Sequence, residues 1–341
     1  MTVRLGFIGT GDLGADHVRR CANILSGATV SALYNRTQSK AQTVAEQFAP
    51  EALVTATPEE LIESPEVEAI VISSASQTHE DLVLMAIEAG KYVFCEKPLA
   101  TTAAGCERIL HAESAAAKRL VQVGFMRPYD EGYQNLKSLL TDDAVGPVLM
   151  AHAAHRNPFS GPHYTREMLI SETLIHDINT FHWLLGESFR TVQVFYPRPT
   201  SRADAALRDP QLVLLETSSG VLITVEVFVN CQFGYDVQCA LIGENGEVRL
   251  PEPARAALRK NGQTSVAIPM DCKERFATAY DRELQAFVDG VATGKLTGPD
   301  SWAGYVASAT ADACIRAQKS GQKEAVQLIT QPEFYRHDTA L

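Results

Sequence analysis

The chain has 341 residues, of which 45% are hydrophobic and 21% charged, a composition typical of a soluble globular protein with two domains. Its 41 Asp and Glu against 30 Lys and Arg give a formal charge of −11, which argues against a nucleic-acid-binding protein because such a protein needs a basic face. No run of about 18 apolar residues predicts a membrane span, no signal-peptide pattern opens the chain, and the seven cysteines lack CxxC spacing. We therefore expect a cytoplasmic protein with reduced thiols, no zinc site and no nucleic-acid or membrane partner.

Short β-branched runs alternate with longer helical patterns up to about residue 125, and this alternation predicts a parallel sheet with crossover helices. The expected strands are Val3–Ile8, Thr29–Tyr34, Ala69–Ser73, Tyr92–Cys95 and Leu120–Val123. The expected helices are Leu13–Leu25, Ser39–Phe48, His79–Ala89 and Ala103–Lys118. We predict an α/β domain of the Rossmann type over residues 1–125.

The pattern changes after residue 145, where one helical stretch is followed by strands that turn residues such as Asn245-Gly246 separate into hairpins. The expected helix is Arg166–Leu185, and the expected strands are Arg190–Tyr196, Leu212–Thr217, Val221–Asn230, Tyr235–Ile242 and Glu247–Leu250. Two more helices, about Phe276–Ala292 and Trp302–Lys319, follow. Residues 126–341 thus predict an α+β domain with a large, mostly antiparallel open β-sheet.

A glycine-rich loop, Gly9-Thr10-Gly11-Asp12-Leu13-Gly14, directly follows the first expected strand and opens the first helix. In that context GxGxxG predicts a dinucleotide site, because the first glycine allows a tight turn, the second lets the backbone approach a pyrophosphate, and the third lets helix and strand pack closely. The N-terminus of the helix would add N–H donors for the phosphates. The alternative interpretation is a plain strand–helix turn.

The end of the second strand is where many NAD enzymes place an acidic residue that binds the ribose 2′-hydroxyl. This chain has Asn35-Arg36-Thr37 there, with Lys40 close behind. The missing carboxylate removes repulsion toward a 2′-phosphate, and Arg36 can bind that phosphate with paired hydrogen bonds. These residues favour NADP over NAD. Under the alternative, Arg36 stacks on adenine, Asn35 binds an unphosphorylated ribose, and NAD is the cofactor.

Two further loops follow the carboxyl ends of expected strands, where ligands bind to parallel sheets. The first contains Ser74, Ala75 and His79, and the second contains Glu96 and Lys97 before a proline. We assign these residues to the cofactor site. Lys97 ends an apolar run, so partial desolvation would suit it to proton exchange, whereas the alternative is a solvated surface lysine.

These three motifs resemble the glucose–fructose oxidoreductase/inositol dehydrogenase (Gfo/Idh/MocA) superfamily over nearly the whole chain. The segments Ser171–Leu185, Leu207–Gln211, Val225–Asp236 and Thr310–Cys314 are similar to the bacterial myo-inositol 2-dehydrogenase branch. The resemblance implies an NAD(P)-dependent oxidoreductase whose residues 1–125 bind the dinucleotide and whose residues 126–341 bind substrate and form the oligomer. It also implies a homotetramer that packs through the open face of the C-terminal sheet.

Within the expected helix Arg166–Leu185, three polar residues lie at i, i+4 and i+7 and therefore share one face: Glu172, His176 and Asn179. A carboxylate one turn away would orient His176, and histidine titrates near neutral pH, as a base that takes a hydroxyl proton must. An isolated helical histidine is more often structural, but the resemblance favours the catalytic role. We expect no metal site, because His182 lies on another face of the helix and no other ligand cluster is present.

The resemblance further implies that Lys97 hydrogen-bonds the reacting oxygen and that His176 is the acid/base, with Glu172 standing where many relatives have Asp. A pocket for a small polyhydroxylated substrate would use side chains rich in donors and acceptors: Arg127, His155, Asn157, Thr173, Asn179, Tyr235 and Tyr280. Asn179 stands where Asp is usual in the branch, and an amide both donates and accepts. The substrate could therefore be another inositol stereoisomer, an inosose or a pyranose sugar.

The leading hypothesis is an NAD(P)-dependent dehydrogenase that reversibly oxidises a ring secondary hydroxyl of a cyclitol, myo-inositol or a stereoisomer, to the ketone. One alternative is an NADPH-dependent reductase or dehydrogenase of a pyranose sugar, a keto-sugar or an inosose. Another is a regulator that binds the cofactor without turnover. The presence of both Lys97 and His176 argues against the regulator.

Overall fold

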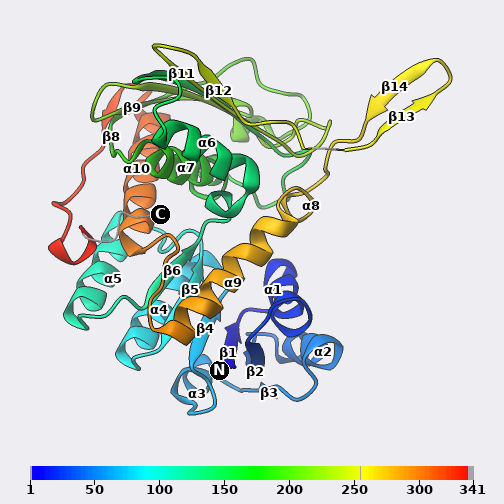
Figure 1. The fold of residues 1–341 in the computed structure, drawn as a ribbon, viewed down its shortest axis with the longest axis vertical. Helices are drawn as coiled ribbons and strands as arrows, with labels where there is room; N and C mark the ends of the chain where they lie inside the picture. Colours follow the sequence, from blue (N-terminus) through cyan, green and yellow to red (C-terminus); the bar gives the residue numbers. More distant parts are fainter. Residues whose placement is uncertain (1, 254, 337–341) are drawn as a thin grey trace. The chain divides into compact units, whose positions relative to one another are not determined.

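The computed structural model describes residues 2–253 and 255–336, which form two compact units (Figure 1). The first unit contains the chain up to Phe125, Tyr280–Ser308 and the described residues from Leu328 onward, and the second contains Met126–Ala279 and Ala309–Gln327. The first change of unit coincides with the boundary expected after residue 125. The later segments of the first unit depart from the expected contiguous division.

A parallel six-stranded sheet in the order β3-β2-β1-β4-β5-β6 organises the first unit. Its strands are β1 (Val3–Ile8), β2 (Ala28–Tyr34), β3 (Leu53–Val54), β4 (Ala69–Ile72), β5 (Tyr92–Glu96) and β6 (Val121–Gly124). The helices between them are α1 (Asp12–Asn23), α2 (Gln38–Phe48), α3 (Pro58–Glu63), α4 (His79–Glu88) and α5 (Ala103–Ala115). The predicted Rossmann arrangement is confirmed. The short β3 and α3 were not predicted, since neither is long enough to show a hydrophobic period.

The core of this unit takes in a helix from far along the chain. Helix α9 (Ala277–Thr293) contributes Leu284, Phe287 and Val288 to the same hydrophobic cluster as the buried side chains of β1 and β2. The ring of Phe287 lies 5.7 Å from that of Phe94 in β5. Burial of these apolar side chains explains why residues from Tyr280 onward group with the N-terminal segment.

A seven-stranded sheet in the order β12-β11-β7-β10-β9-β8-β15 organises the second unit. Its strands are β7 (Val148–Arg156), β8 (Phe189–Phe195), β9 (Gln211–Thr217), β10 (Leu222–Phe228), β11 (Asp236–Gly243), β12 (Glu247–Arg249) and β15 (Glu324–Ala325). Only β7 and β10 pair in parallel, so the predicted mostly antiparallel sheet is confirmed. Strand β7 was not predicted, because its buried and exposed positions do not alternate regularly.

Helices α6 (Glu131–Thr141) and α7 (Ile175–Leu185) lie on one side of this sheet (Figure 1). The short α8 (Cys272–Arg275) precedes α9, and α10 (Ser301–Ser320) completes the helices of the described chain. The prediction of one α-helix over Arg166–Leu185 was wrong in its first part. Residues Leu169–Leu174 form a π-helix with i→i+5 hydrogen bonds, and α7 follows it directly.

The two faces of the large sheet differ in burial. In β10 the side chains of Ile223, Val225 and Val227 are fully buried, whereas Leu222 on the opposite face is 45% exposed. Leu222 is paired with Met150 of β7, which is also exposed. The sheet therefore buries one face inside the unit and leaves the other open, as its alternating sequence predicts.

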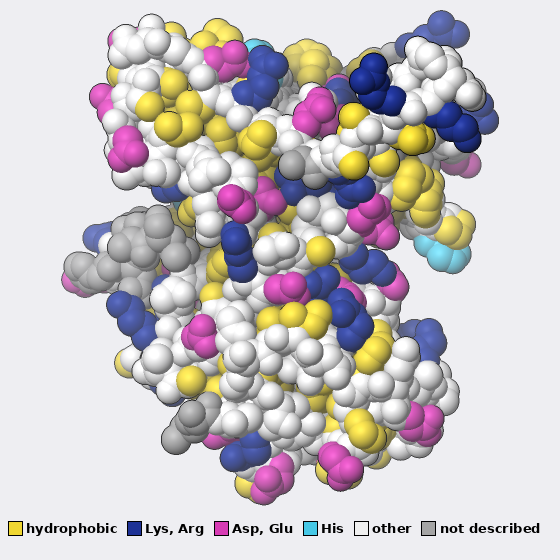
Figure 2. Space-filling model, turned by 45° about the vertical axis from the view of Figure 1, so that its right-hand side comes forward, with side chains coloured by type: hydrophobic (Ala, Val, Ile, Leu, Met, Phe, Trp, Pro, Cys, Tyr) yellow, Lys and Arg dark blue, Asp and Glu magenta, His cyan; other side chains and the backbone are white. Residues whose placement is uncertain are grey.

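A two-stranded hairpin of β13 (Ala257–Lys260) and β14 (Gln263–Val266) extends from the rest of the second unit (Figure 1). All eight strand residues are exposed, and Leu258 and Val266 are among the large exposed apolar side chains. Figure 2 shows Lys and Arg side chains gathered at this hairpin, which carries Arg259 and Lys260. Among the described residues, no helix is both long enough and apolar enough to cross a bilayer.

Candidate active site

The glycine-rich turn between β1 and α1 has open space at its second glycine. Gly9 has a φ of +99°, and a Cβ there would lie 2.5 Å from the backbone nitrogen of Ser74. A Cβ on Gly14 would lie 2.2 Å from the carbonyl oxygen of Gly9. A Cβ on Gly11, by contrast, would meet no atom within 4 Å. The first and third glycines are therefore required by the fold, while the second leaves room for a ligand, which fits a dinucleotide pyrophosphate.

A cavity of about 470 Å³ adjoins this turn within the first unit. Its lining includes two cations and no carboxylate, and the predicted cofactor residues that line it are Gly9, Gly11, Asn35, Arg36, Lys40, Ser74 and Ala75. The other predicted cofactor residues lie outside this lining: Thr10, Asp12, Leu13, Gly14, Thr37, His79, Glu96 and Lys97. The cavity brings together the glycine turn, the end of β2 and the loop after β4, as the sequence analysis expected.

At the end of β2, Asn35 and Arg36 differ in their surroundings. Asn35 donates a hydrogen bond of 2.8 Å from Nδ2 to the buried Thr10 Oγ1, so its amide holds the β2 end against the glycine turn. Arg36 and Lys40 are exposed and line the cavity, which leaves their charged groups accessible to a ligand. The two cations can neutralise a phosphate, while Asn35 already has a structural role.

The predicted His79 is buried and connects two loops. Its Nδ1 lies 2.7 Å from the carbonyl oxygen of Pro98, and its Nε2 lies 3.2 Å from the carbonyl oxygen of Ser74. Both ring nitrogens thus face backbone carbonyl oxygens, which accept hydrogen bonds. His79 therefore joins the loop after β4 to the loop after β5 rather than lining the cavity.

The carboxylate of Glu96, at the end of β5, lies between the glycine-turn helix and Lys97. Its Oε1 is 2.8 Å from Nε2 of His17, a fully buried residue of α1. Its Oε2 accepts a hydrogen bond of 3.2 Å from the backbone N–H of Lys97. Sequence analysis did not select His17, although its place one turn after Gly14 in an apolar helix face could have indicated a buried polar contact.

In the second unit, Arg127, His155 and Asp177 form a buried polar cluster. Arg127 Nη1 donates a hydrogen bond of 2.6 Å to Asp177 Oδ1, and Asp177 Oδ2 lies 2.9 Å from His155 Nδ1. All three side chains are at most 2% exposed. Buried charges in such a setting require compensation, and each ionic group here has an opposite charge in contact.

Asp177 is the ionic centre of this cluster. Burial alone would raise the pKa of its carboxyl, but the charges and hydrogen bonds of Arg127 and His155 bring that pKa below its ordinary value. Burial alone would lower the pKa of Arg127, but the charge of Asp177 raises this pKa above its ordinary value, so the guanidinium remains charged. Asp177 was missed in the sequence analysis, since nothing in the order of residues shows that this helical carboxylate is buried against an arginine.

Two further rings lie beside His155 of the Arg127–Asp177–His155 cluster. The ring of His155 lies 5.9 Å from that of His176 and 5.8 Å from that of Tyr235. Asp177 Oδ2 and Arg127 Nη2 both lie 2.9 Å from His155 Nδ1, and the Tyr235 hydroxyl lies 3.4 Å from His155 Nε2. Burial raises the pKa of Tyr235, so its hydroxyl stays protonated and can donate. The second unit thus brings together four of the predicted site residues.

The π-helix places Glu172 and Thr173 just before α7. Glu172 therefore lies in the π-helix, whereas His176 and Asn179 lie in α7. Thr173 is buried, and its Oγ1 lies 2.5 Å from the hydroxyl of Tyr164. Single π turns inside helices occur frequently at functional sites.

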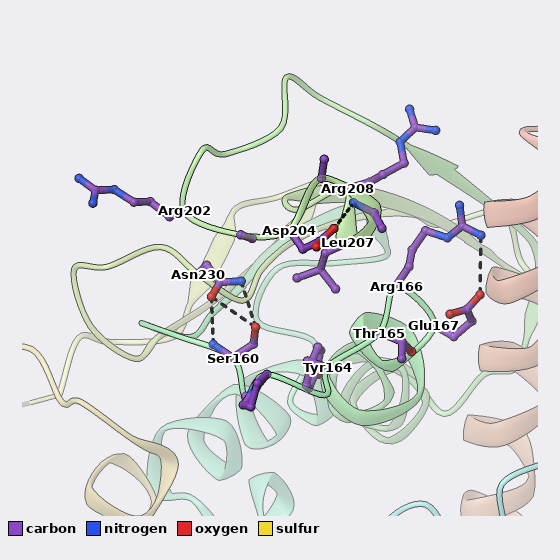
Figure 3. A pocket seen from close by; sticks show the side chains of 15 residues that line it. Ser160, Tyr164, Thr165, Arg166, Glu167, Arg202, Asp204, Leu207, Arg208 and Asn230 are labelled. Carbon is purple, nitrogen blue, oxygen red and sulfur yellow. Dashed lines mark hydrogen bonds and ion pairs between the residues drawn. The ribbon is translucent and has the colours of Figure 1, made fainter.

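Tyr164 also lines a polar cavity of about 760 Å³ within the second unit (Figure 3). Asn230 forms part of its wall and bonds to Ser160 and Asp209. In Figure 3 the guanidinium groups of Arg202 and Arg208 extend away from the cavity. The arginines therefore do not converge on a common ligand position, and the structural contribution of this region is the support of Thr173 through Tyr164.

The remaining predicted residues lie in different environments. Asn157 follows β7, and its backbone N–H bonds to the carbonyl oxygen of Phe228 in β10. Asn179 is 2% exposed in α7. Tyr280 belongs to the first unit, where its ring lies 5.8 Å from that of His17 and 5.5 Å from the Arg20 guanidinium carbon.

Among the described residues, no group of three His, Cys, Asp or Glu side chains is placed to hold a metal ion. All seven cysteines lie in the described chain and none takes part in a disulfide. The chemistry open to the candidate residues is therefore hydrogen bonding, proton transfer and dinucleotide binding.

Comparison with known proteins assigns both parts of the chain to one family. Residues 3–125 match the model of the oxidoreductase family with NAD-binding Rossmann fold, and residues 137–328 match that of its C-terminal alpha/beta domain. The chain belongs to the Gfo/Idh/MocA oxidoreductase family. An inositol 2-dehydrogenase of Azotobacter vinelandii is 52% identical over 98% of this chain and 99% of that protein, and one of Ralstonia nicotianae is 51% identical over 98% and 100%.

Solved structures of the family give the same result. A myo-inositol dehydrogenase from Lactobacillus casei, in complex with NAD(H) and myo-inositol, superposes with a TM-score of 0.96 at 39% identity, covering 98% of this chain and all of that one. A scyllo-inositol dehydrogenase from the same organism shares the fold, with a TM-score of 0.87 at 22% identity over 96% of this chain and 99% of that one. The chain is thus an oxidoreductase with an NAD(P)-binding Rossmann unit.

Proposed function

We propose that this protein reversibly oxidises a ring secondary hydroxyl of a cyclitol, myo-inositol or a stereoisomer, to the ketone, with NAD(P) as hydride acceptor. The observation that carries the proposal is the buried Arg127–Asp177–His155 cluster beside His176 and Tyr235, in a chain 52% identical over its length to an inositol 2-dehydrogenase. A compact set of fixed donors and acceptors suits a small ring with a hydroxyl on every carbon.

Each catalytic residue has a role that its chemistry supports. Lys97, held at the end of β5 by the Glu96 carboxylate, donates a hydrogen bond to the reacting oxygen. His176 takes the hydroxyl proton as the carbon–hydrogen bond breaks, and Glu172 assists it. A bound nicotinamide supplies the acceptor for the hydride. In the reverse direction His176 returns the proton, so the chain serves oxidation and reduction alike.

The substrate pocket requires several further hydrogen bonds. His155 can form a hydrogen bond through Nε2, because Asp177 and Arg127 both contact its Nδ1, and Tyr235 can donate through its hydroxyl. Arg127 is locked on Asp177, so it acts by fixing His155 rather than by moving. Asn157, Thr173 and Asn179, which lie in the same unit, complete the proposed pocket. Because Asn179 can both donate and accept, we expect it to select which ring hydroxyl is presented for oxidation.

A substrate screen tests this proposal. Cyclitols and aldoses are offered with NAD⁺ and with NADP⁺, and keto-sugars and inososes with the reduced cofactors, while reduced-nicotinamide absorbance is followed. We expect turnover of a cyclitol and its loss in Lys97→Ala and His176→Ala. Tight cofactor binding without any turnover would identify a regulator instead. Turnover of a pyranose or a keto-sugar alone would identify the sugar enzyme, and undiminished activity in either variant would refute its catalytic role.

We further propose that the enzyme prefers NADP to NAD. Support comes from Arg36 and Lys40, two exposed cations beside a cavity lined by no carboxylate. A 2′-phosphate adds charge-assisted hydrogen bonds that a ribose hydroxyl cannot supply. Arg36→Ala should lower kcat/KM for NADP⁺ by about tenfold, or about 1.4 kcal/mol, and leave that for NAD⁺ nearly unchanged. A wild-type preference of tenfold or more for NAD⁺ would contradict the proposal.

The open face of the seven-stranded sheet supports a homotetramer as the assembled form. Its exposed apolar side chains include Met150, Phe195, Leu212 and Leu222, which a second copy of the chain would remove from water. We also propose a cytoplasmic location, in keeping with seven cysteines that form no disulfide. Mass measurement in solution, in the presence of reductant, tests the assembly.

A further inference from the structure

Glu283, on α9, is a buried carboxyl group that the fold does not neutralise. It is fully buried in the first unit, and within the described chain neither of its carboxyl oxygens has a hydrogen-bond partner. Glu113 in α5 is buried to the same degree, yet its carboxyl accepts hydrogen bonds from Ser301, Tyr335 and the backbone N–H groups of residues 120 and 121. The same unit satisfies one buried carboxylate and leaves another without donors, a difference that calls for a chemical explanation.

The nearest charged groups explain which form of Glu283 is present. Burial and the charge of Glu96 in β5 raise the pKa of Glu283 well above its ordinary 4.5, and Arg20 of α1 opposes this only in part. Arg20 is itself engaged by Asp16 of its own helix and by Asp281 of α9. The other titratable groups nearby on α1 are His17, bound to Glu96, and Cys21, whose pKa burial raises to about 12. The cation that acts on Glu283, Arg20, is therefore already paired with two other carboxylates.

Both carboxylate oxygens of Glu96 have hydrogen-bond partners. His17 contacts one of its oxygens, and the backbone N–H of Lys97 donates to the second. Gly124 of β6 leaves space for the group, since a Cβ there would lie 3.1 Å from the carboxyl carbon and both oxygens. Any force that moves the Glu96 carboxylate therefore acts directly on the backbone of Lys97.

We propose that Glu283 is a positioning residue: as a neutral acid beside Glu96, it allows Glu96 to remain the anion that holds the backbone of Lys97. Its importance for catalysis rests on the proposed role of Lys97. When Glu283 releases its proton to solvent at alkaline pH, two like charges share one buried site. Their repulsion displaces the Glu96 carboxylate and weakens its bond to the Lys97 N–H, so the enzyme loses activity as pH rises.

Whether Glu283 holds a proton in the folded protein can be tested through the free energy of unfolding, independently of catalysis. Glu283 holds its proton in the folded protein at pH values where the unfolded chain has released it, so the free energy of unfolding should fall as pH rises above about 4.5. Glu283→Gln and Glu283→Met have no such proton, and Met is included as an apolar replacement of similar size. We expect both variants to gain stability relative to wild type between about pH 5 and pH 9 in urea unfolding. A constant difference across that range would overturn the proposal.

The positioning effect is tested by hydrogen–deuterium exchange at the Lys97 amide, compared between proteins at equal pH so that the intrinsic rate cancels. At a pH about one unit above the pKa of Glu283, where this carboxyl is ionised, we expect the Lys97 amide to exchange about tenfold faster in wild type than in Glu283→Gln. Asp289→Asn, the same change at an exposed position of the same helix, should exchange like wild type. Equal exchange in wild type and Glu283→Gln at every pH would refute the link to Lys97.

Kinetics separate this inference from the proposed function. The pH at which kcat falls on the alkaline side should be higher in Glu283→Gln than in wild type by about one pH unit or more, with little change in KM. In Asp289→Asn this pH should be the same as in wild type. The same alkaline limb of kcat in wild type and in Glu283→Gln would contradict the positioning role. If no polyol is turned over, the proposed function fails, and the unfolding and exchange measurements still decide whether Glu283 holds a proton that controls the Lys97 backbone.

Discussion

Asp177 concentrates more of the chemistry of the second unit than any other side chain described above. It neutralises Arg127, contacts Nδ1 of His155 and lies next to His176 in sequence. Four residues that could be proposed from the sequence lie close together in the second unit: Arg127, His155, His176 and Tyr235. Asp177 and His17 could not be proposed from it, since burial of a polar side chain depends on neighbours distant in the chain.

Replacing Asp177 should damage both stability and activity. Asp177→Asn leaves Arg127 as an unpaired buried charge, so we expect the free energy of unfolding to fall by about 3–5 kcal/mol. The released His155 should lower kcat/KM for the polyol by about 100-fold. Urea unfolding and steady-state kinetics measure the two effects. Glu247→Gln, which breaks an exposed pair with Arg249, should alter neither, and equal effects in both variants would contradict this account.

The same carboxylate should contribute to acid denaturation. Since the folded-state pKa of Asp177 lies below its ordinary 3.8, its contribution is fully present above that value and is lost as pH falls through the lower, folded-state pKa. The stability difference between wild type and Asp177→Asn should therefore shrink below about pH 4. Unfolding free energies measured from about pH 6 downward would show it, and a difference that does not change with pH would exclude the mechanism.

Among the elements, the β1–α1 turn and the π-helix matter most to the proposed chemistry. The turn was predictable because its glycines stand at the GxGxxG spacing directly after a strand and at the start of a helix. The π-helix was not, since its sequence has the same hydrophobic pattern as an α-helix. Strand β7 lacked regular alternation, and the hairpin β13–β14 buries no side chain at all, so neither gave the signal that sequence analysis relies on.

Two glycine variants separate folding from cofactor binding. Gly11→Ala adds a Cβ in open space, so we expect an unchanged Tm but cofactor binding weaker by about tenfold or more. Gly9→Ala is strained at a φ of +99° and collides with backbone atoms, so we expect a clear loss of Tm. Thermal unfolding and fluorescence titration with the reduced cofactor measure these outcomes. Normal cofactor affinity in Gly11→Ala would show that the turn does not bind the pyrophosphate.

For the whole molecule, the proposed homotetramer makes the open sheet face the surface through which copies of the chain would associate. Leu222→Glu places a charge among exposed apolar side chains of that face and should convert the tetramer into smaller species in analytical ultracentrifugation. Leu53→Glu makes the same change at an exposed leucine of the first unit and should leave the mass unchanged. A tetramer that persists in Leu222→Glu, or a wild-type monomer, would refute assembly through this face.

The hydrogen bonds of Glu113 have a consequence for how the chain folds as it is synthesised. Tyr335 reaches the Glu113 carboxylate across 222 residues of sequence, and Ser301 does so across 188. On the ribosome, the N-terminal segment therefore emerges with two of the donors to this buried carboxylate still to be translated, along with the apolar side chains of α9. The Rossmann unit is the first to be synthesised, but it is completed only after nearly the whole second unit has been made. A nascent chain that stalls before α9 therefore leaves the core of the Rossmann unit incomplete, although most of the seven-stranded sheet has already been translated.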